Sequence, residues 1–467
     1  MTSTDPSGPA LPPALAEAAR RAAAYLAGLP ERPVGPPADA ATLRAGLGGP
    51  LPDGPDDPAG VVAALAEAAE PGLVASAGPR YFGFVIGGGV PAAVGADWLT
   101  SAWDQNAGMY VAAPAAMVAE EVTGEWLKEL LGLPAAASTG FVTGATMANF
   151  TGLAAARHAV LARAGWDVEA AGLAGAPPVR VIVGAARHVT VDVALRYLGF
   201  GTPGASPSIT VVPADDQGRI VPGAVADAVA AGPPGPVIVA VQAGNVNTGA
   251  IDPIAAVRAA APGAWIHVDG AFGLWAGASP ALRSQVAGVE LADSWATDGH
   301  KWLNVPYDSG LVFVADPAAH RAATTLAASY LTGGEGERNG YDWAPEASRR
   351  ARAFPIWAAL RSLGRSGVAD LVDRCCAHAR RFAEGLADVP GAEIRNEVTL
   401  NQVLVRFTGA EGDRTATVAA AVQREGTCWA GTTTWHGAPA LRISVSGWST
   451  TRDDVDRSLE AIRKAAS

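Results

Sequence analysis

Short runs of β-branched and other apolar residues recur through the middle of this chain, and they constrain its fold more than any other feature. Within each run the apolar residues are mostly continuous, which is typical of strands buried on both faces of a parallel sheet. The runs cover residues 179–183, 209–212, 237–241, 265–268 and 311–314. Because helical stretches such as 222–231 and 254–261 lie between some of them, the sequence predicts an α/β layer architecture.

The segments on either side of this region predict two further parts. An Ala-rich helical pattern covers residues 15–29, and the Pro- and Gly-rich stretch 30–58 after it predicts an extended arm or linker. After about Tyr341, a basic helix-like run and two alternating strand patterns indicate a smaller α+β domain. The predicted division is an N-terminal helical arm over 1–78, a large domain over 79–345 and a small C-terminal domain over 346–467.

Charge and cysteine content exclude several classes of partner and location. The 34 basic and 45 acidic residues give a net charge of -11, so no nucleic-acid partner is expected. Three cysteines are too few for a disulfide framework and indicate reduced thiols in a cytoplasmic protein. The first residues lack the pattern of a signal peptide. Since the uncharged stretch 130–156 is broken by Pro134 and four glycines, no membrane helix is expected either.

Two strand ends carry the residues with the most specific chemistry. Asp269 follows a run that should be fully buried, and Asp298-Gly299-His300-Lys301 follows the next strand. A buried unpaired carboxylate is costly, whereas a pyridinium nitrogen would be a favourable partner for it. Pyridoxal 5′-phosphate needs such a carboxylate, and it also needs a lysine for a Schiff base. The motif therefore indicates this cofactor and no metal ion; the competing interpretation is a structural ion pair between Asp269 and Lys301.

Three other loops at predicted strand ends point the same way. Residues 143–146 combine small and hydroxyl side chains before a helix, an arrangement that favours a phosphate, although a simple turn before a core helix is the alternative. His188 can lie over a cofactor ring and contact a substrate carboxylate, or serve as a structural histidine. The polar loop 244–253 either contacts the cofactor or is a tight connection capped by Asp252.

With these motifs, the chain resembles the group II pyridoxal-phosphate-dependent decarboxylases, which include aromatic-L-amino-acid, histidine, tyrosine and glutamate decarboxylases. The similarity runs from about residue 79 to 448, and it is most specific in HVDGAF around Asp269, DGHKW around Lys301 and the segment 345–352. The resemblance implies the fold type I architecture: a large domain with a mostly parallel seven-stranded sheet, a small C-terminal α+β domain and an N-terminal arm. It also implies an intertwined homodimer with its active site at the subunit interface.

The resemblance further assigns roles by matching position. Lys301 would form the Schiff base, and Asp269 would pair with the pyridine nitrogen. His188 would stack on the cofactor ring, and Ala271 would pack on its other face. The residues that would hold the phosphate are Ala145, Thr146 and His300.

The reaction implied is decarboxylation of an L-amino acid to an amine and CO2, with Lys301, His188 and Tyr341 as catalytic residues. In the family a tyrosine on a mobile loop returns a proton after CO2 leaves, and here the matching position falls on Gly340 or Tyr341. The polar, Gly-rich stretch 331–339 should form a lid over the active site of the neighbouring subunit.

Departures from the family pattern leave alternatives open. Adjacent threonines in the family are replaced here by Asn245 and Val246. Without a tyrosine acid, the same chemistry would end in oxidative formation of an aldehyde; carbon–carbon lyase, aminotransferase and non-catalytic scaffold roles are further alternatives. The sequence does not name the substrate, although four aromatic residues of the N-terminal region indicate an apolar or aromatic side chain: Tyr81, Phe82, Phe84 and Trp103.

Overall fold

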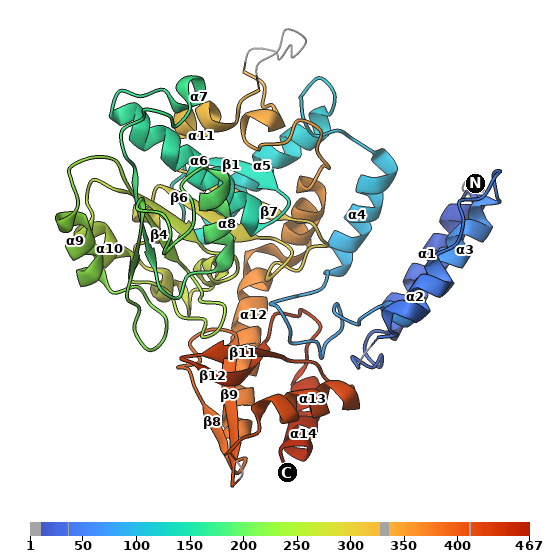
Figure 1. Cartoon of the computed structure of the whole chain (residues 1–467). Coiled ribbons are helices and arrows are strands. Elements are labelled where there is room, and N and C mark those ends of the chain that lie inside the picture. Colours follow the sequence, from blue (N-terminus) through green and yellow to red (C-terminus); the bar gives the residue numbers. More distant parts are fainter. Residues whose placement is uncertain (1–10, 36, 327–335, 411) are drawn as a thin grey trace.

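The computed structural model of the protein divides into a helical N-terminal segment, a layered central domain and a small C-terminal domain (Figure 1). The structure describes residues 11–35, 37–326, 336–410 and 412–467. Helices α1 (Pro13–Gly28) and α3 (Pro58–Ala69) pack along each other and project to the side of the body. Helix α12 (Ala353–Ala387), which is kinked at the non-helical residue Gly364, runs from the large domain into the small one.

The Pro- and Gly-rich stretch 30–58 contains a helix, α2 (Ala40–Leu47), so the prediction of an extended segment is wrong over these residues. The Asp39 carboxylate accepts a hydrogen bond from the Thr42 N–H at 2.8 Å, which satisfies one of the unpaired amide groups at the start of the helix. This cap, followed by a short Ala- and Leu-containing run, outweighs the surrounding prolines and glycines.

The large domain is built on a seven-stranded sheet in the order β1-β7-β6-β5-β4-β2-β3. Its strands are β1 (Ser138–Val142), β2 (Arg180–Gly184), β3 (Ile209–Val212), β4 (Val237–Gln242), β5 (Trp265–Asp269), β6 (Ser294–Asp298) and β7 (Gly310–Val314). The pairs from β3 to β6 are parallel, whereas β7 is antiparallel to both of its neighbours. The predicted mostly parallel seven-stranded sheet is therefore confirmed.

Strands β1 and β6 lack the β-branched runs that mark the other five, although both are buried along their whole length. Their polar side chains find partners inside the protein. The Ser138 hydroxyl lies 2.9 Å from His320 Nδ1, and the Ser294 hydroxyl accepts a hydrogen bond from Trp265 Nε1 at 2.9 Å. Such partners make a polar strand tolerable in a core.

Helices cover both faces of the sheet, as Figure 1 shows. The helices of this region other than α12 are α4 (Pro91–Trp103), α5 (Pro114–Leu131), α6 (Ala145–Arg163), α7 (Val168–Ala171), α8 (Val189–Tyr197), α9 (Pro222–Ala231), α10 (Ile254–Ala260) and α11 (Pro317–Thr324). One hydrophobic core lies between the sheet and α5, α9, α10 and α12, and a second lies between the sheet and α6, α8 and α11. Short 3-10 helices are η1 (Glu70–Gly72), η2 (Gly273–Ala278), η3 (Arg283–Val286), η4 (Val289–Leu291) and η5 (Gly340–Asp342).

The small domain has a five-stranded antiparallel sheet next to two helices. These elements are β8 (Ala392–Ile394), β9 (Gln402–Gly409), β10 (Gly412–Asp413), α13 (Thr415–Glu425), β11 (Gly431–Trp435), β12 (Ala438–Ser444) and α14 (Arg452–Ala466). Thr451 caps α14 in a reciprocal capping box with Asp454. The domain boundaries proposed after residues 78 and 345 lie outside the α-helices and strands and remain predictions.

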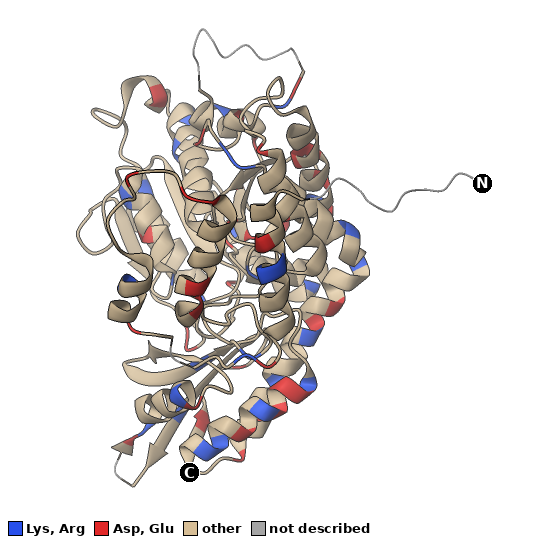
Figure 2. Ribbon diagram, turned by 90° about the vertical axis from the view of Figure 1, so that its right-hand side faces the viewer, with Lys and Arg blue, Asp and Glu red and all other residues tan. Residues whose placement is uncertain are grey.

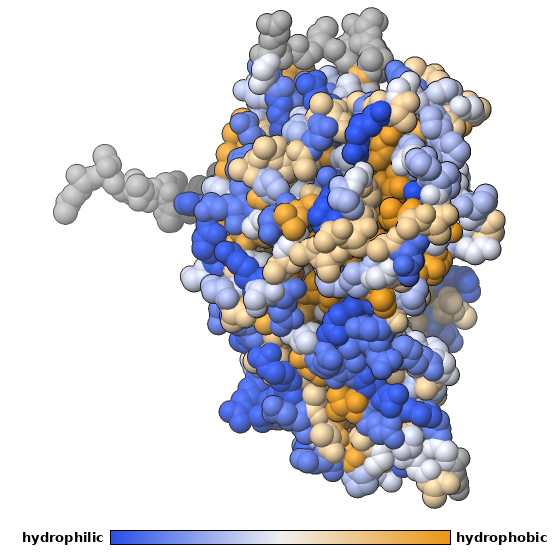
Figure 3. Space-filling model, turned by 90° about the vertical axis from the view of Figure 1, so that its left-hand side faces the viewer, coloured by the Kyte–Doolittle hydropathy of each residue, from blue (hydrophilic) through white to orange (hydrophobic). Residues whose placement is uncertain are grey.

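The molecular surface carries charges of both signs close together on the face in Figure 2. The opposite face, in Figure 3, mixes hydrophilic and apolar groups. Over the part of the chain that the structure describes, no helix combines the length and apolar character that crossing a bilayer requires.

A buried cluster of charges holds the segment 336–350 against the large domain. Glu120 of α5 is fully buried and forms ion pairs with Arg338 at 3.1 Å and with Arg349 at 2.9 Å. Arg349 also donates to the carbonyl oxygens of Ala107 and Phe141 at 2.7 and 2.6 Å. One carboxylate thus compensates two guanidinium groups that are largely removed from water.

Glu120→Ala is expected to destabilise the protein by about 3–5 kcal/mol, because it leaves two buried guanidinium charges without their carboxylate. The midpoint of urea unfolding at fixed protein concentration measures this. Glu129→Ala is the matched control on the same helix, since its ion pair with Arg365 is exposed at the surface. Equal midpoints for the two variants would contradict the role given to Glu120.

Candidate active site

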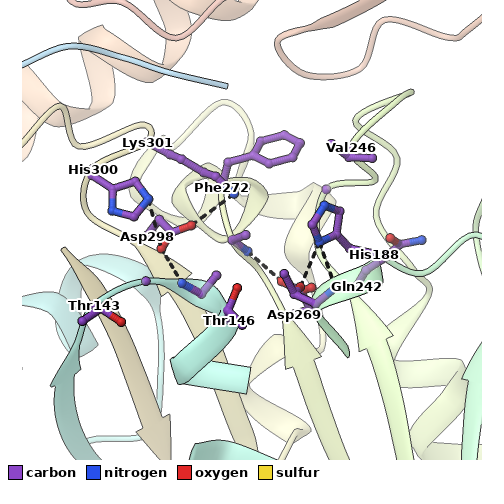
Figure 4. A pocket seen from close by; sticks show the side chains of 15 residues that line it. Thr143, Thr146, His188, Gln242, Val246, Asp269, Phe272, Asp298, His300 and Lys301 are labelled. Carbon is purple, nitrogen blue, oxygen red and sulfur yellow. Dashed lines mark hydrogen bonds and ion pairs between the residues drawn. The ribbon is translucent and has the colours of Figure 1, made fainter. Parts of the chain in front are cut away.

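A cavity of about 390 Å³ opens at the carboxyl ends of the central strands, beside the N-terminus of α6 (Figure 4). This is where parallel α/β sheets place their ligands. All seven residues predicted to bind the cofactor line it: Ala145, Thr146, His188, Asp269, Ala271, His300 and Lys301. Figure 4 shows His300, Lys301 and Asp298 on one side of the cavity and His188 and Asp269 on the other.

Asp269 ends β5 with its carboxylate at the cavity wall and is only 5% exposed. The one hydrogen-bond partner of this carboxylate among the described residues is the N–H of Ala271, at 3.2 Å. A buried carboxylate with so little compensation is unfavourable by itself. It is therefore suited to receive a cationic or N–H donor group from a ligand in the cavity.

Lys301 is the one lysine that lines the cavity, and the chain has only three. Lys128 is buried and bound to Glu125 at 2.8 Å, whereas Lys464 lies in the last helix. The Lys301 Nζ lies 3.1 Å from Asp298 Oδ2. The ion pair between Asp269 and Lys301 considered from the sequence is not formed; Lys301 pairs with Asp298, three residues before it.

The N-terminus of α6 forms an anion-binding cradle. The N-cap residue of this helix is Gly144, which has no side chain that could cap it. Instead, Asp298 Oδ1 accepts a hydrogen bond from the N–H of Ala145 at 2.6 Å. The backbone packs so closely here that a Cβ on Gly310 would lie 2.4 Å from the Gly144 Cα. The remaining first-turn amide groups and the Thr146 hydroxyl are suited to a phosphate.

His300 stands on the opposite wall of this cradle. Its Nδ1 accepts the N–H of Ser309 at 3.1 Å, and its ring stacks on Tyr307 with centroids 4.2 Å apart. Burial lowers the pKa of His300, although nearby Asp298 acts in the opposite direction. A neutral ring with Nδ1 as acceptor carries its proton on Nε2, where it can donate to an anion.

His188 is the N-cap residue of α8 and lines the cavity beside Asp269. Its Nδ1 accepts the Thr190 N–H at 3.3 Å and lies 2.8 Å from the Thr190 hydroxyl. Burial lowers the pKa of His188, and the charge of Asp269 partly offsets this effect. The ring is therefore held at one edge, and it can present its face and its Nε2 to a ligand.

Tyr341 does not line this cavity within its own chain. It lies buried in η5, where its N–H donates to the Gly108 carbonyl at 3.3 Å, and it lines a separate hollow with Arg321 and Asp342. Of the predicted lid over 331–339, residues 331–335 lie outside the described residues. The catalytic role of Tyr341 thus remains a prediction that depends on a second subunit.

Two features of the cavity were missed from the sequence. The sequence motif assigns no role to Asp298, although a carboxylate that ends a buried strand is a usable signal for one. The replaced threonine pair also has a structural explanation. Asn245 donates to the Ala186 carbonyl at 2.9 Å and holds the loop, while Val246 lines the cavity.

These residues fit pyridoxal 5′-phosphate. The N-terminus of α6 would hold the phosphate, Asp269 would face the pyridine nitrogen, and Lys301 would offer its amine in the same cavity. Within the described ranges, no group of three or more histidine, cysteine or carboxylate residues is placed to hold a metal ion.

Comparison with known proteins agrees with this chemistry. The family model described as the pyridoxal-dependent decarboxylase conserved domain matches residues 42–408. The chain belongs to this family. Its cofactor is pyridoxal 5′-phosphate, and its reaction is the decarboxylation of an amino acid.

Individual relatives show how far the similarity extends. An L-2,4-diaminobutyrate decarboxylase of Rhizobium meliloti (strain 1021) is 30% identical over 88% of this chain and 83% of its own length. An aromatic-L-amino-acid decarboxylase of Bacillus atrophaeus is 29% identical over 73% of this chain and 70% of its own. The crystal structure of Oryza sativa TDC with PLP and tryptamine has the same fold, with a TM-score of 0.87, 23% identity and coverage of 97% and 96% of the two chains.

Borohydride treatment of the protein loaded with pyridoxal 5′-phosphate is expected to fix the cofactor to Lys301 and to no other lysine. Peptide mapping by mass spectrometry can decide this because the only other candidates are Lys128 and Lys464. Lys301→Ala should show no reduced adduct, whereas a Lys464→Ala control should be labelled like the wild type. Labelling of Lys128 or Lys464 in the wild type would refute the assignment.

Proposed function

We propose that this decarboxylase converts an L-amino acid with an apolar or aromatic side chain to the amine and CO2, as a homodimer in the cytoplasm. The observation that carries the proposal is the joint presence of Asp269, Lys301 and the α6 cradle in one cavity. When bound there, pyridoxal 5′-phosphate supplies a protonated ring that withdraws electrons from the bond that breaks.

Each cofactor-binding residue that lines the cavity has its own role in holding the cofactor. Asp269 keeps a proton on the pyridine nitrogen, and Lys301 holds the cofactor through its amine. His188 covers one face of the ring, and Ala271 packs on the other. The phosphate is held by the first-turn amide groups of α6 that remain free, by the Thr146 hydroxyl and by His300, while the Ala145 N–H stays bound to Asp298. Such fixed charges and donors commonly contribute several kcal/mol in the transition state.

Aromatic side chains of the N-terminal region, two of them exposed and Tyr81 buried beside one of these, support the apolar or aromatic substrate. Tyr81 stacks on Trp429 with centroids 4.9 Å apart, and Phe84 lies against the same indole while 60% of its surface stays exposed. Trp103 is also half exposed. Phe82 makes no such contribution because it is buried in the core. Aromatic surfaces of this kind bind apolar side chains well.

A second candidate substrate is L-2,4-diaminobutyrate, which the name of the Rhizobium meliloti relative favours. The loaded enzyme should be tested for CO2 release and product identity with aromatic, aliphatic, dibasic and acidic L-amino acids. Amine and CO2 from aromatic or aliphatic substrates support the proposal. Release from diaminobutyrate alone would support the second candidate, and aldehyde with ammonia and peroxide would support oxidative decarboxylation.

Uncovered apolar side chains on the N-terminal helices and α4 support the homodimer. These residues are Leu15, Leu26, Val61, Leu65, Trp98, Leu99 and Trp103. A hollow of about 750 Å³ lies between the end of α1 and α4, and a second copy of the chain would cover such surfaces.

The cytoplasmic location is supported by three free thiols, all of which are buried. Burial raises the pKa of Cys375 and that of Cys428 to about 12.

In the dimer, Tyr341 of the partner subunit returns the proton to the substrate carbon after CO2 leaves. Mixing Lys301→Ala and Tyr341→Phe homodimers after partial unfolding tests this arrangement. Each hybrid dimer would contain one site with both wild-type residues, so about a quarter of wild-type amine formation should return for random pairing in a symmetric dimer.

The unmixed parent variants, treated in the same way, are the control. Because Tyr341 acting in its own subunit would leave no intact site in a hybrid, hybrids that form without recovering activity would refute the proposal. Full activity of Tyr341→Phe by itself would also refute it.

A further inference from the structure

A line of hydrogen-bonded polar side chains runs from His188 into the core of the large domain. The Thr190 hydroxyl lies 2.8 Å from His188 Nδ1 and accepts a hydrogen bond from Asn149 Nδ2 at 3.2 Å. The other end of this amide, Asn149 Oδ1, lies 2.9 Å from His267 Nε2. Asn149 and His267 are fully buried, in α6 and β5.

The line continues beyond His267 to a fixed donor. His267 Nδ1 lies 2.8 Å from the Ser294 hydroxyl, which also accepts the indole N–H of Trp265 at 2.9 Å. Burial lowers the pKa of His267 to about 4, so its ring is neutral near pH 7 and carries a single proton. The line therefore joins α8, α6, β5 and β6 by groups that are all hydrogen-bonded.

The direction of every hydrogen bond in the line follows from one amide group. The Thr190 N–H donates to His188 Nδ1, because His188 caps α8, and an amide N–H cannot act as an acceptor. His188 Nδ1 is consequently unprotonated and receives the Thr190 hydroxyl proton as well. Thr190 Oγ1 must then accept from the amide of Asn149.

The hydrogen-bond directions at Asn149, His267 and Ser294 follow from those at Thr190. With its nitrogen used toward Thr190, the Asn149 amide presents its oxygen to His267 and accepts the Nε2 proton. His267 Nδ1 then accepts from the Ser294 hydroxyl, which accepts in turn from Trp265. No group in the line has to reverse its role.

We propose that this line of hydrogen bonds fixes His188 as the neutral tautomer with its proton on Nε2, and that Thr190, Asn149 and His267 are positioning residues for it. The proposal rests on the cofactor-facing role given to His188 above. Figure 4 shows the bonded edge of the His188 ring pointing toward the strand ends and the opposite edge pointing away from them, so the Nε2 proton is available to the substrate carboxylate.

A neutral donor suits a reaction in which the carboxylate charge leaves the substrate. A cationic imidazole would stabilise the carboxylate of the bound substrate more than the transition state, and so it would raise the barrier. A neutral N–H can orient the carboxylate with a smaller penalty. Burial and the charges of Lys301 and Arg442 oppose protonation of His188, whereas the charges of Asp269 and Asp298 favour it.

The test is a long-range ¹⁵N–¹H correlation spectrum of the full-length protein, loaded with pyridoxal 5′-phosphate and labelled at its seven histidines. His188→Gln assigns the His188 signals. The expected spectrum near pH 7 is that of a neutral ring with Nε2 protonated. A cationic ring, or a ring protonated on Nδ1, would overturn the proposal.

Two variants test the positioning role. Thr190→Val removes the hydroxyl that donates to His188 Nδ1, so the His188 pKa should rise by up to about one unit. The acidic limb of the pH–rate profile should move to higher pH by the same amount. The control Thr190→Ser keeps a hydroxyl and should match the wild type. Asn149→Asp has no N–H for Thr190 and should shift the profile in the same direction as Thr190→Val. An unchanged His188 titration in both Thr190→Val and Asn149→Asp would overturn the positioning role.

These measurements separate two kinds of failure. If the wild type releases no CO2 from any amino acid, the proposed function fails while the tautomer of His188 can still be measured. If the wild type decarboxylates its substrate but His188 has another tautomer, only the present proposal fails.

Discussion

The carboxylate of Asp298 is the interaction on which the rest of the site depends. Its two oxygens contact the first amide of α6 and the Lys301 amine, and its main chain bonds to the Ala271 carbonyl and to the Trp275 indole. The end of β6, the start of α6 and the loop after β5 are thereby held around one residue that is 2% exposed. The N-terminus of α6, where we propose that the phosphate binds, and the Lys301 amine are therefore held by the same carboxylate.

The fold was largely predictable because its signal is local. Five strands consist of continuous runs of mostly apolar residues in the sequence. Asp269 and Lys301 lie at or just after strand ends, where a sheet of this kind places its ligands. The polar strands β1 and β6 gave no such signal, since their burial depends on distant partners such as His320 and Trp265. The helix α2 was missed because a single capping carboxylate outweighed a breaker-rich composition.

The site was less predictable than the fold for two physical reasons. Thr190, Asn149 and His267 are separated by many residues in sequence, and only the folded chain shows that their polar groups meet. Tyr341 raises a different difficulty, because its surroundings within one chain do not include Lys301. In the proposed dimer, each chain binds its cofactor with its own residues but needs its partner for the last proton.

The small number of lysines has a practical consequence. Lys128 is buried in an ion pair, and Lys301 lies in the cavity, so Lys464 on α14 is the exposed side-chain amine of the described chain. Coupling to an amine-reactive support at Lys464 would attach the protein by its small domain and leave the cavity open. In the proposed holoenzyme the cofactor engages the Lys301 amine, so molecules attached through a lysine side chain would share one orientation, which suits a flow reactor or a surface sensor.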